Sequence, residues 1–220
     1  MSEQAQTSVN RVQRRKQRTR AALIGAAQAF IAEGRLNVAV LDITQAADVG
    51  MGSFYNYFDS KEELFSAAVA DALDAHGALL DVLTADIEDP AETFACRFRL
   101  TGRLFRRRPQ ESQILLANGV QLLASDRGLA PRALRDIEAA ARAGRFTVED
   151  SHLALAIAGG AIMGLGALLR QEPERDDAEA SDSVTASVLR LFGMSAADAA
   201  EVCTRPLPDL ETIAPPDPLA

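Results

Sequence analysis

The sequence predicts an all-α protein. Apolar residues recur at helical spacing along most of its 220 residues, and no stretch shows the apolar and polar alternation of a half-buried strand. Alanine is abundant and tryptophan is absent, while the hydrophobic and charged fractions of 48% and 25% are ordinary for a globular protein. A chain of this length can bury a sizeable core in one or two domains. We therefore expect helices throughout and assign them in chain order.

The first predicted helix runs from about Val12 to Glu33 and ends at Gly34, a residue type that commonly stops helices. We expect residues 1–10 to form a disordered arm before it. The N-terminal stretch MSEQAQTSVNRVQ has no apolar core, so we expect no signal peptide. One face of the helix is apolar and should be buried: Ala22, Leu23, Ala26, Ala27, Phe30 and Ile31.

Residues 38–58 are predicted to form two short helices joined by a tight turn. Val38–Ala47 carries apolar residues at helical spacing, and Asp48-Val49-Gly50 then breaks the helix because Asp and Gly tolerate sharp turns. The second helix, about Met51–Phe58, needs the first as a platform, since isolated helices below about 12–15 residues are marginal in water. This is the arrangement of a helix-turn-helix, in which a supported helix enters the major groove of DNA.

A third helix of this region is predicted to begin at Lys61. Ser60-Lys61-Glu62-Glu63 is a capping box, in which Ser60 caps the helix and Glu63 folds back on the cap. An ammonium group at a helix N-terminus opposes the helix dipole, which makes sense if an anion binds there. Lys61, one of only two lysines in the chain, is therefore predicted to bind a DNA phosphate.

The net charge of −8 argues by itself against nucleic-acid binding, but the charges are unevenly distributed. Residues 1–35 contain seven basic and two acidic residues, whereas residues 62–220 contain 15 basic and 26 acidic residues. A basic head on an acidic body fits a DNA-binding domain, and Arg18 and Arg20 on the basic half of the first helix should face DNA. A solvated basic arm is the alternative, which the neighbouring helix-turn-helix disfavours.

This region resembles the N-terminal domain of TetR-type transcriptional regulators. The matching string is Ile43-Thr44, then ADVGMGSFYNYF over residues 47–58 and SKEEL over residues 60–64. Strict similarity runs from Thr19 to Leu64, and such an ordered string is more specific than a generic helix-turn-helix match. Beyond it, the helical layout and residues 144–150 resemble the family. Four positions depart from the family pattern, two of them by losing a hydroxyl that should contact phosphate: Ala39, Asp48, Gly50 and Met51.

The resemblance also implies which residues face DNA. Thr44 should lie near the DNA backbone, and Lys61 should bind phosphate. Phe54 and Phe58 should instead be core residues that hold the recognition helix. The residues expected to face the groove or its walls are Met51, Gly52, Ser53, Tyr55, Asn56 and Tyr57.

Four further helices are predicted at about Lys61–Ala85, Pro90–Arg107, Glu111–Ala124 and Pro131–Ala143. In the family that the chain resembles, these helices enclose a small-molecule pocket. The arginines of residues 97–108 suggest an anionic ligand, but we favour a charged face that pairs with the acidic body. For each pocket candidate, the alternative is a surface residue or one paired within the protein. The candidates are His76, Phe98, Arg103, Phe105, Asn118 and Gln121.

Two long helices are predicted near the C-terminus, at about Val148–Gln171 and Ser183–Phe192, with a charged loop over residues 171–181 and a last short helix at Ala196–Cys203. The first contains 17 uncharged residues after His152, the lower limit of a membrane span. Because it lacks aromatic belts and is rich in glycine, we expect no membrane. The resemblance implies instead a four-helix dimer interface, with the residues Ala156, Gly160, Met163, Gly164, Ala167, Val184, Val188 and Leu191.

The expected organisation is a disordered arm (1–10), a helix-turn-helix DNA-binding domain (11–60), a helical effector-binding and dimerisation domain (61–204) and a disordered proline-rich tail (205–220). No nucleophile motif, phosphate loop or paired-carboxylate signature is found, and His76, His152, Cys96 and Cys203 lack metal-ligand spacing. We therefore expect no enzyme, cofactor or metal. The two cysteines should be reduced thiols of a cytoplasmic protein.

The residues and the resemblance together favour a ligand-responsive DNA-binding transcriptional regulator. We expect a repressor that binds a near-palindromic operator in double-stranded DNA as a homodimer and is released by an unidentified small-molecule effector. The alternative is a helical ligand-binding or dimerisation module of the same fold that has lost operator binding.

Overall fold

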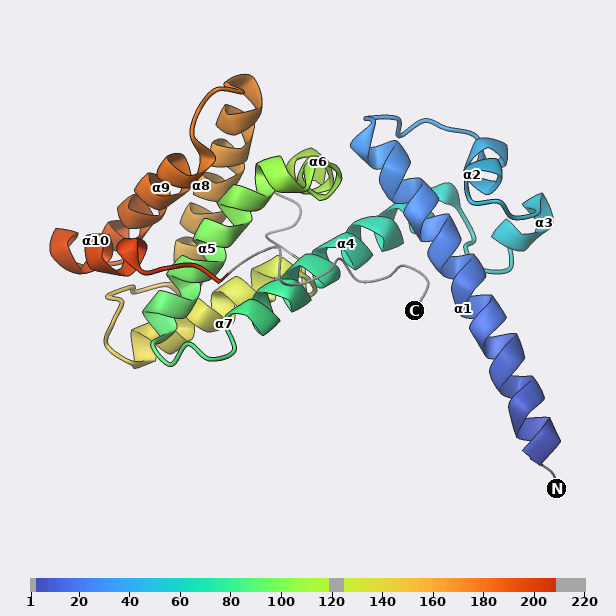
Figure 1. The fold of residues 1–220 in the computed structure, drawn as a ribbon, viewed down its shortest axis with the longest axis horizontal. Helices are drawn as coiled ribbons and strands as arrows, with labels where there is room; N and C mark the ends of the chain where they lie inside the picture. Colours follow the sequence, from blue (N-terminus) through green and yellow to red (C-terminus); the bar gives the residue numbers. More distant parts are fainter. Residues whose placement is uncertain (1–2, 119–124, 209–220) are drawn as a thin grey trace. The chain divides into compact units, whose positions relative to one another are not determined.

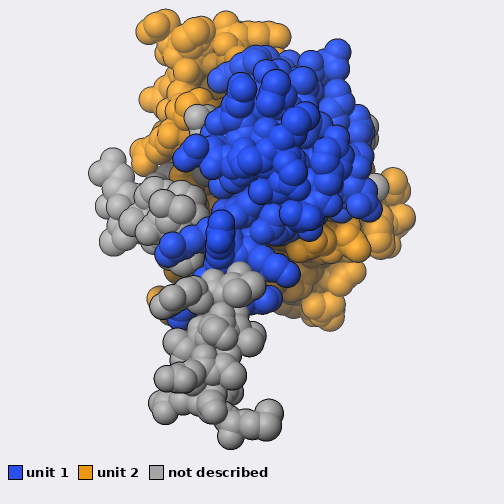
Figure 2. Space-filling model, turned by 90° about the vertical axis from the view of Figure 1, so that its right-hand side faces the viewer, with its two compact units in different colours: residues 1–71, 214–220 blue, residues 72–213 orange. Residues whose placement is uncertain are grey.

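The computed structural model describes residues 3–118 and 125–208 (Figure 1). The expected features at residues 119–124 and 209–220 lie outside this range. Every regular element among the described residues is an α-helix, which confirms the all-α prediction. The chain divides into two compact units, one of residues 1–71 and 214–220 and one of residues 72–213 (Figure 2). Helix α4 (Lys61–Leu83) begins in the first unit and ends in the second.

The first unit consists of α1 (Glu3–Ala32), α2 (Val40–Ala46), α3 (Met51–Phe54) and the beginning of α4. α2 packs against both α1 and α3. All four helices contribute to one core, because each short helix must bury its apolar face against the others. The core side chains include Leu23, Ala27, Phe30 and Ile31 of α1, Ile43 of α2, Phe54 of α3 and Leu64 of α4.

α1 is longer than predicted, because it begins at Glu3 and includes residues that we expected to form a disordered arm. Residues 3–24 contain no proline or glycine that would interrupt a helix. At its other end, Gly34 has a φ of 72°, the left-handed conformation of a helix-terminating glycine.

α3 is shorter than predicted, because it ends at Phe54 rather than Phe58. Residues 55–58 continue as hydrogen-bonded turns, in which the amides of Tyr57 and Phe58 donate to the carbonyl of Phe54 at 2.9 and 3.1 Å. Gly52 and Asn56 have low helix propensity, which is the physical reason that the helix is not extended. Phe54 and Phe58 are nevertheless both buried, as predicted.

The turn before α3 contains one strained residue. Asp48 has a φ of 52° and is the only residue other than glycine, among those that the structure describes, with a positive φ. For most L-residues this conformation costs about 1–2 kcal/mol, and Asp tolerates it because its short polar side chain can bond locally. Asp48 can therefore occupy the position where the resemblance would place a glycine.

The start of α4 contains the predicted cap with one difference. The hydroxyl of Ser60 accepts from the amide of Glu63 at 3.1 Å, as expected for a capping box. The carboxylate of Glu63 also folds back, but it accepts from the amide of Asp59 at 2.7 Å rather than from that of Ser60. The helix N-terminus is therefore well capped from the sequence alone.

The second unit contains the rest of α4 together with six further helices: α5 (Pro90–Arg107), α6 (Pro109–Asn118), α7 (Leu129–Arg142), α8 (Ser151–Gln171), α9 (Asp177–Leu191) and α10 (Ala196–Thr204). α5 is the central helix and packs against α6, α7, α8, α9 and α10 (Figure 1). The ring of Phe94 lies 6.0 Å from that of Phe98, 5.7 Å from Phe146 and 5.6 Å from Phe192. This aromatic cluster joins α5 to the ends of α8 and α9 that lie nearest to it in the fold.

Helix boundaries in the second unit agree with the predictions for α5 and differ for α9. We expected a charged loop over residues 171–181, but α9 already begins at Asp177. The carboxylate of Asp176 accepts from the amides of Ala178 and Glu179 at 2.8 and 2.9 Å, so it caps a helix that starts within the expected loop. α6 similarly begins at Pro109, because the missing amide of proline is tolerated in the first turn of a helix.

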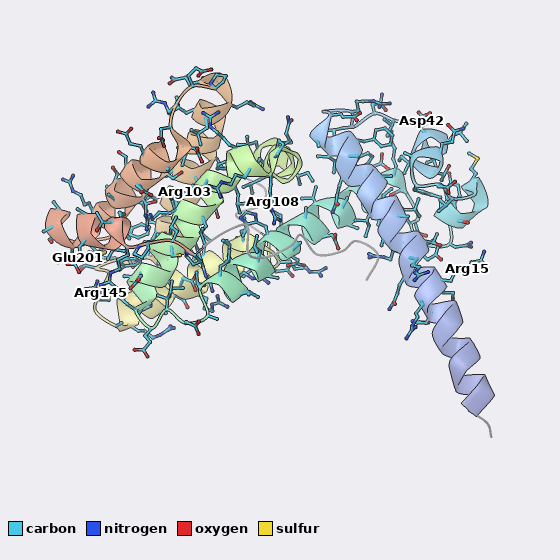
Figure 3. The ribbon with its side chains drawn as sticks, viewed as in Figure 1. Arg15, Asp42, Arg103, Arg108, Arg145 and Glu201 are labelled. Atoms are coloured by element: carbon cyan, nitrogen blue, oxygen red, sulfur yellow. The ribbon has the colours of Figure 1, made fainter. Side chains whose placement is uncertain are left out.

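The arginines of α5 pair with carboxylates of neighbouring helices. Arg99 is buried and donates from Nε to Oδ1 of Asp182 at 2.7 Å, and Nη1 of Arg103, labelled in Figure 3, lies 2.9 Å from the same oxygen. Arg97 is likewise paired with aspartates of α4 and α7. The interpretation that these arginines pair with the acidic body is therefore correct for the three, but they are buried or half-buried rather than solvated.

The Asp182 pair predicts a pH-dependent contribution to stability. Burial opposes ionisation, but the hydrogen bonds and charges of Arg99 and Arg103 outweigh it and hold the pKa of Asp182 below its ordinary value. The stabilisation is therefore present above the unfolded pKa of about 3.9 and is lost as the pH falls through the folded pKa. We expect Asp182→Asn to lower the free energy of unfolding at pH 7 by about 2 kcal/mol, less than for a fully buried pair because the side chain is 33% exposed.

The measurement is urea unfolding of both proteins between pH 3 and pH 8. The difference between them should shrink toward pH 3. Glu138→Gln removes a surface pair with Arg142 at 3.7 Å and should change stability little at any pH. A difference for Asp182→Asn that stayed constant over this range would contradict the assignment.

The strained turn gives a second stability prediction. Asp48→Val should lower the free energy of unfolding by about 1–2 kcal/mol, because a β-branched residue fits a positive φ poorly. Asp48→Gly should not destabilise, since glycine adopts this conformation freely. Asp86→Val, at an exposed position with an ordinary φ, is the matched control. Equal losses for the two valine variants in urea unfolding would show that the turn carries no strain.

Candidate nucleic-acid interface and ligand cavity

α3 presents one exposed face and one buried face. Met51 and Tyr55 are 52% and 61% exposed, and Gly52 and Asn56 are also exposed. Phe54, on the opposite face, has no exposed surface. This face of α3 is therefore free to contact a partner. Of the other residues that we expected here, Ser53 and Tyr57 are half-buried.

A platform of aromatic rings holds α3 in place. The ring of Phe54 lies 5.1 Å from that of Tyr55 in an edge-to-face arrangement and 6.1 Å from that of Phe58. The guanidinium of Arg20, on α1, lies over the ring of Phe58 at 5.4 Å. Such cation–π contacts contribute about 0.5–1 kcal/mol at exposed sites. Arg20 therefore links α1 to the turn that follows α3 while its side chain remains exposed.

The basic half of α1 is exposed over the residues whose side chains are described. Arg14, Arg15, Lys16 and Arg18 are all exposed, and Arg15 is labelled in Figure 3. Within residues 13–20, no acidic residue alternates with them. Exposed cations of this density supply non-specific affinity for a phosphate backbone.

Lys61 is half-buried at the first position of α4 and donates from Nζ to the side-chain carbonyl of Asn37 at 3.0 Å. Asn37 lies in the segment between α1 and α2. An ammonium group has three donors, so this bond orients Lys61 and leaves donors for a phosphate oxygen. The sequence did not indicate the part that Asn37 plays here.

Thr44 does not occupy the expected position near DNA. Its residue is only 1% exposed, and its hydroxyl donates to the carbonyl of Leu41 at 3.0 Å. The side chain lies on the core face of α2 beside Ile43, so it cannot reach a phosphate. At the start of α2, Ala39 offers no hydroxyl, and the Asp42 carboxylate instead accepts from the Ala39 amide at 3.3 Å.

The second unit encloses a cavity of about 110 Å³ between α4, α5, α7 and α8. Most of its wall is apolar, and the rings of Phe94 and Phe98 contribute to it. Concave, mostly apolar sites with few polar groups are typical of small-molecule binding. The other apolar lining side chains include Leu80, Leu115, Leu155, Ile162 and Met163.

One edge of this cavity is charged. Nη1 of Arg97 lies 2.8 Å from Oδ2 of Asp136, and Nη2 lies 2.9 Å from Asp81. Arg132 donates from Nε to Asp81 at 2.9 Å, and Arg135 contacts Asp136 at 3.2 Å. Burial raises the pKa of Asp136, and the charges of Arg97 and Arg135 only partly offset it. The edge is therefore an ion-pair cluster with equal numbers of the two signs nearest the cavity.

The predicted pocket residues are distributed unevenly around this cavity. Phe98 lines it, whereas His76 and Phe105 line a smaller pocket that shares Thr101, Leu115 and Leu129 with it. Arg103 lines neither, because it is held by Asp182. The side chain of Asn118 and all of Gln121 lie outside the described residues. The predictions missed Arg97 and Asp136, whose pairing joins two helices far apart in sequence.

The predicted dimer residues also separate into exposed and buried positions. Ala156, Gly160 and Gly164 are exposed on α8, and nothing lies within 4 Å of a Cβ built on either glycine. Leu191 is 67% exposed, whereas Ala167 and Val184 are half-buried. Two predictions need correction, since Val188 is buried in the core and Met163 lines the cavity. Leu153 and Ile157, which we did not predict, are exposed beside the small residues.

α8 is the one helix among the described residues that is long and apolar enough to cross a membrane. Its buried residues, including Ala154, Leu155 and Ala158, belong to the core of the second unit. A core helix of a globular protein passes the same test of length and composition. Among the described residues, no group of three or more His, Cys, Asp or Glu side chains could hold a metal ion.

Two family models match the chain. The model described as "Bacterial regulatory proteins, tetR family" matches residues 22–68, and the model described as "Tetracyclin repressor-like, C-terminal domain" matches residues 89–205. The chain belongs to the TetR family. The first match contains the exposed α3, and the second contains most of the cavity wall. The resemblance of residues 19–64 to this family is thus confirmed.

Solved structures agree with this assignment. The TetR-family chain is 34% identical to RolR without ligand, with a TM-score of 0.69 over 86% of this chain and 98% of RolR. It is 32% identical to RolR in complex with the ligand resorcinol, with a TM-score of 0.63 over 89% and 97% of the two chains. SmeT, the repressor of the Stenotrophomonas maltophilia multidrug efflux pump SmeDEF, shares the fold at 19% identity, with a TM-score of 0.63 over 79% and 89%. Among curated proteins, none matches the chain.

The chain is accordingly a ligand-responsive DNA-binding transcriptional regulator of the repressor type, and the expected function is confirmed. TetR proteins form a family of transcriptional regulators, not of enzymes. No match favours the alternative of a module that has lost operator binding.

The position of Lys61 gives a prediction about salt dependence. Each phosphate contact that is lost should reduce the slope of log affinity against log salt by about 0.9. Lys61→Ala should therefore flatten the slope by about 1 per subunit and weaken binding to all sequences alike. Arg142→Ala removes an exposed cation of α7 and should leave the slope unchanged. Fluorescence anisotropy with labelled duplex DNA over a salt series makes the comparison, and equal slopes for all three proteins would rule out a phosphate contact by Lys61.

Proposed function

We propose that this TetR-family chain acts as a homodimeric repressor whose two α3 helices enter successive major grooves of a near-palindromic operator. The observation that carries the proposal is the exposed face of α3 on a buried aromatic platform. A two-fold dimer places such helices about one duplex turn apart, roughly 34 Å. The proposed boundaries are those of the sequence: DNA binding by residues 11–60 and effector binding and dimerisation by residues 61–204.

The DNA contacts that we propose follow from exposure and chemistry. Met51 can make only apolar contacts, for instance with a thymine methyl group, and Gly52 allows close approach of the backbone. Tyr55, Asn56 and Ser53 offer hydrogen-bond donors to base edges or phosphates. Tyr57, Lys61, Arg18 and Arg20 would contact the sugar-phosphate backbone. Thr44 is excluded from this set because it is buried.

The dimer interface that we propose lies on α8 and α9. The exposed face combines three large apolar residues with small residues that allow a second helix to approach closely. Contiguous apolar surface of this kind marks protein–protein contact sites. The residues of the proposed face are Leu153, Ala156, Ile157, Gly160, Gly164 and Leu191.

The switch that we propose connects the cavity to DNA binding through α4. Leu80 of α4 lines the cavity, and the same helix begins at Lys61. An effector that binds more tightly when α4 is tilted would stabilise that state and change the spacing of the two α3 helices. RolR, the relative with a resorcinol-bound structure, supports a small organic effector. We further propose that the protein acts in the cytoplasm without a membrane.

Selection of genomic fragments with the purified protein tests this proposal. Fragments that are bound should share a near-palindromic sequence, and light scattering should give two chains, or a multiple of two, per site. Ile157→Glu, which buries a charge in the proposed interface, should yield a monomer and lower operator affinity at least 10-fold. Ala200→Glu, on the exposed face of α10, should leave both unchanged. A monomer that binds the selected sites as tightly as the wild type would overturn the dimer model.

A further inference from the structure

We propose that the cavity of the second unit takes an uncharged, single-ring aromatic molecule that carries hydroxyl groups, held by Asp136 and Thr101 as hydrogen-bond acceptors. The inference names the ligand class of the effector site in the function proposed above, and it rests on that proposal. Three properties of the cavity support it: its size and lining, its compensated charge, and the kind of polar atom that remains available.

The size of the cavity suits one ring. Its volume is about 110 Å³, somewhat below the roughly 150 Å³ of an engineered apolar cavity that binds benzene. Phe94 and Phe98 offer rings for edge-to-face or offset contacts, and Met163 adapts its shape and favours aromatic neighbours. A long acyl chain would need several times this volume. The lining therefore favours a compact, planar, largely apolar ligand.

The cations of the cavity edge are already neutralised. Arg97 donates from Nε to the hydroxyl of Thr84 at 2.9 Å, and its other two nitrogens contact Asp136 and Asp81 at 2.8 and 2.9 Å. Arg132 is held by Asp81 at 2.9 Å and by the carbonyl of Gly128 at 2.7 Å. An anionic ligand would therefore be buried without a cation of its own, which is costly. This argues against carboxylates and answers the question raised by the arginines of α5.

The atoms that remain available are acceptors. The Asp136 side chain is 7% exposed, and each carboxylate oxygen keeps a lone pair beyond its bond to Arg97 or Arg135. Because burial raises the pKa of Asp136, its carboxylate is a strong acceptor for a hydroxyl.

Thr101 provides the second acceptor. Its hydroxyl hydrogen is directed at the carbonyl of Arg97 at 2.9 Å, so Nε2 of His76, at 3.2 Å, is the donor to the Thr101 oxygen. That oxygen therefore presents a lone pair to the cavity. Arg97 and Thr101 are one turn apart on α5, about 6 Å along its axis. The two acceptors thus suit two hydroxyls on opposite parts of one ring.

Calorimetric titration of the full-length chain with a graded set of probes tests the ligand class. The set consists of phenol, the three dihydroxybenzenes, benzene, benzoate and decanoate. We expect at least one dihydroxybenzene to bind more tightly than phenol, and phenol about 10-fold more tightly than benzene, because each hydroxyl satisfies a buried acceptor. Benzoate and decanoate should show no binding at the same concentrations. Tighter binding of either carboxylate than of every phenol would overturn the inference.

Two variants test the acceptors separately. Asp136→Asn keeps an oxygen for Arg97 but turns a donor toward the ligand, so it should weaken dihydroxybenzene binding about 10-fold or more and leave benzene unaffected. Thr101→Val removes the second acceptor with little change in shape and should weaken dihydroxybenzene more than phenol. Asp182→Asn alters an aspartate that is equally paired with arginines but does not line the cavity, and it should leave affinity unchanged.

Unchanged dihydroxybenzene affinity in both cavity variants would refute the assigned acceptors, and Thr101→Val keeps this test available if Asp136→Asn fails to fold. Operator release is measured separately with the same probes. Binding with the expected variant effects but without release of DNA would support the ligand class and overturn the proposed switch.

Discussion

Burial of Phe54 is the constraint on which the recognition surface depends. α3 has four residues, and a helix of that length does not persist in water without tertiary contacts. The Phe54 ring has no exposed surface, and its contacts with Tyr55 and Phe58 fix the exposed face on the other side of the turn. The geometry offered to DNA is therefore a consequence of core packing rather than of helix propensity.

The second unit solves a different problem, which is how to hold many buried arginines. Arg97, Arg99 and Arg103 lie on the central helix, where unpaired charges would be costly. Aspartates of α4, α7 and α9 compensate them, so the ion pairs tie α5 to three neighbours that are distant in sequence. The same compensation leaves the cavity beside Arg97 electrically balanced. Charge pairing that serves stability thus also restricts which ligands the cavity can accept.

α8 shows how one helix can serve two surfaces. Ala154, Leu155 and Ala158 face the core of their own chain, while Leu153, Ile157 and Gly160 remain exposed. Its long uncharged run is explained by these two apolar faces, since a helix that is buried on one side and pairs with a partner on the other has little room for charge. Hydropathy alone does not distinguish this case from a membrane span.

The sequence by itself determined the helical class, the position of the helix-turn-helix, the burial of Phe54 and Phe58, and the cap at Ser60. These features depend on periodicity, turn chemistry and caps, which are encoded within about ten residues. The tertiary structure alone decided that Thr44 is buried, that Met163 lines a cavity and that Asp136 meets Arg97. Such outcomes depend on how helices distant in the chain pack together, and no local pattern specifies which of two helix faces meets a neighbour.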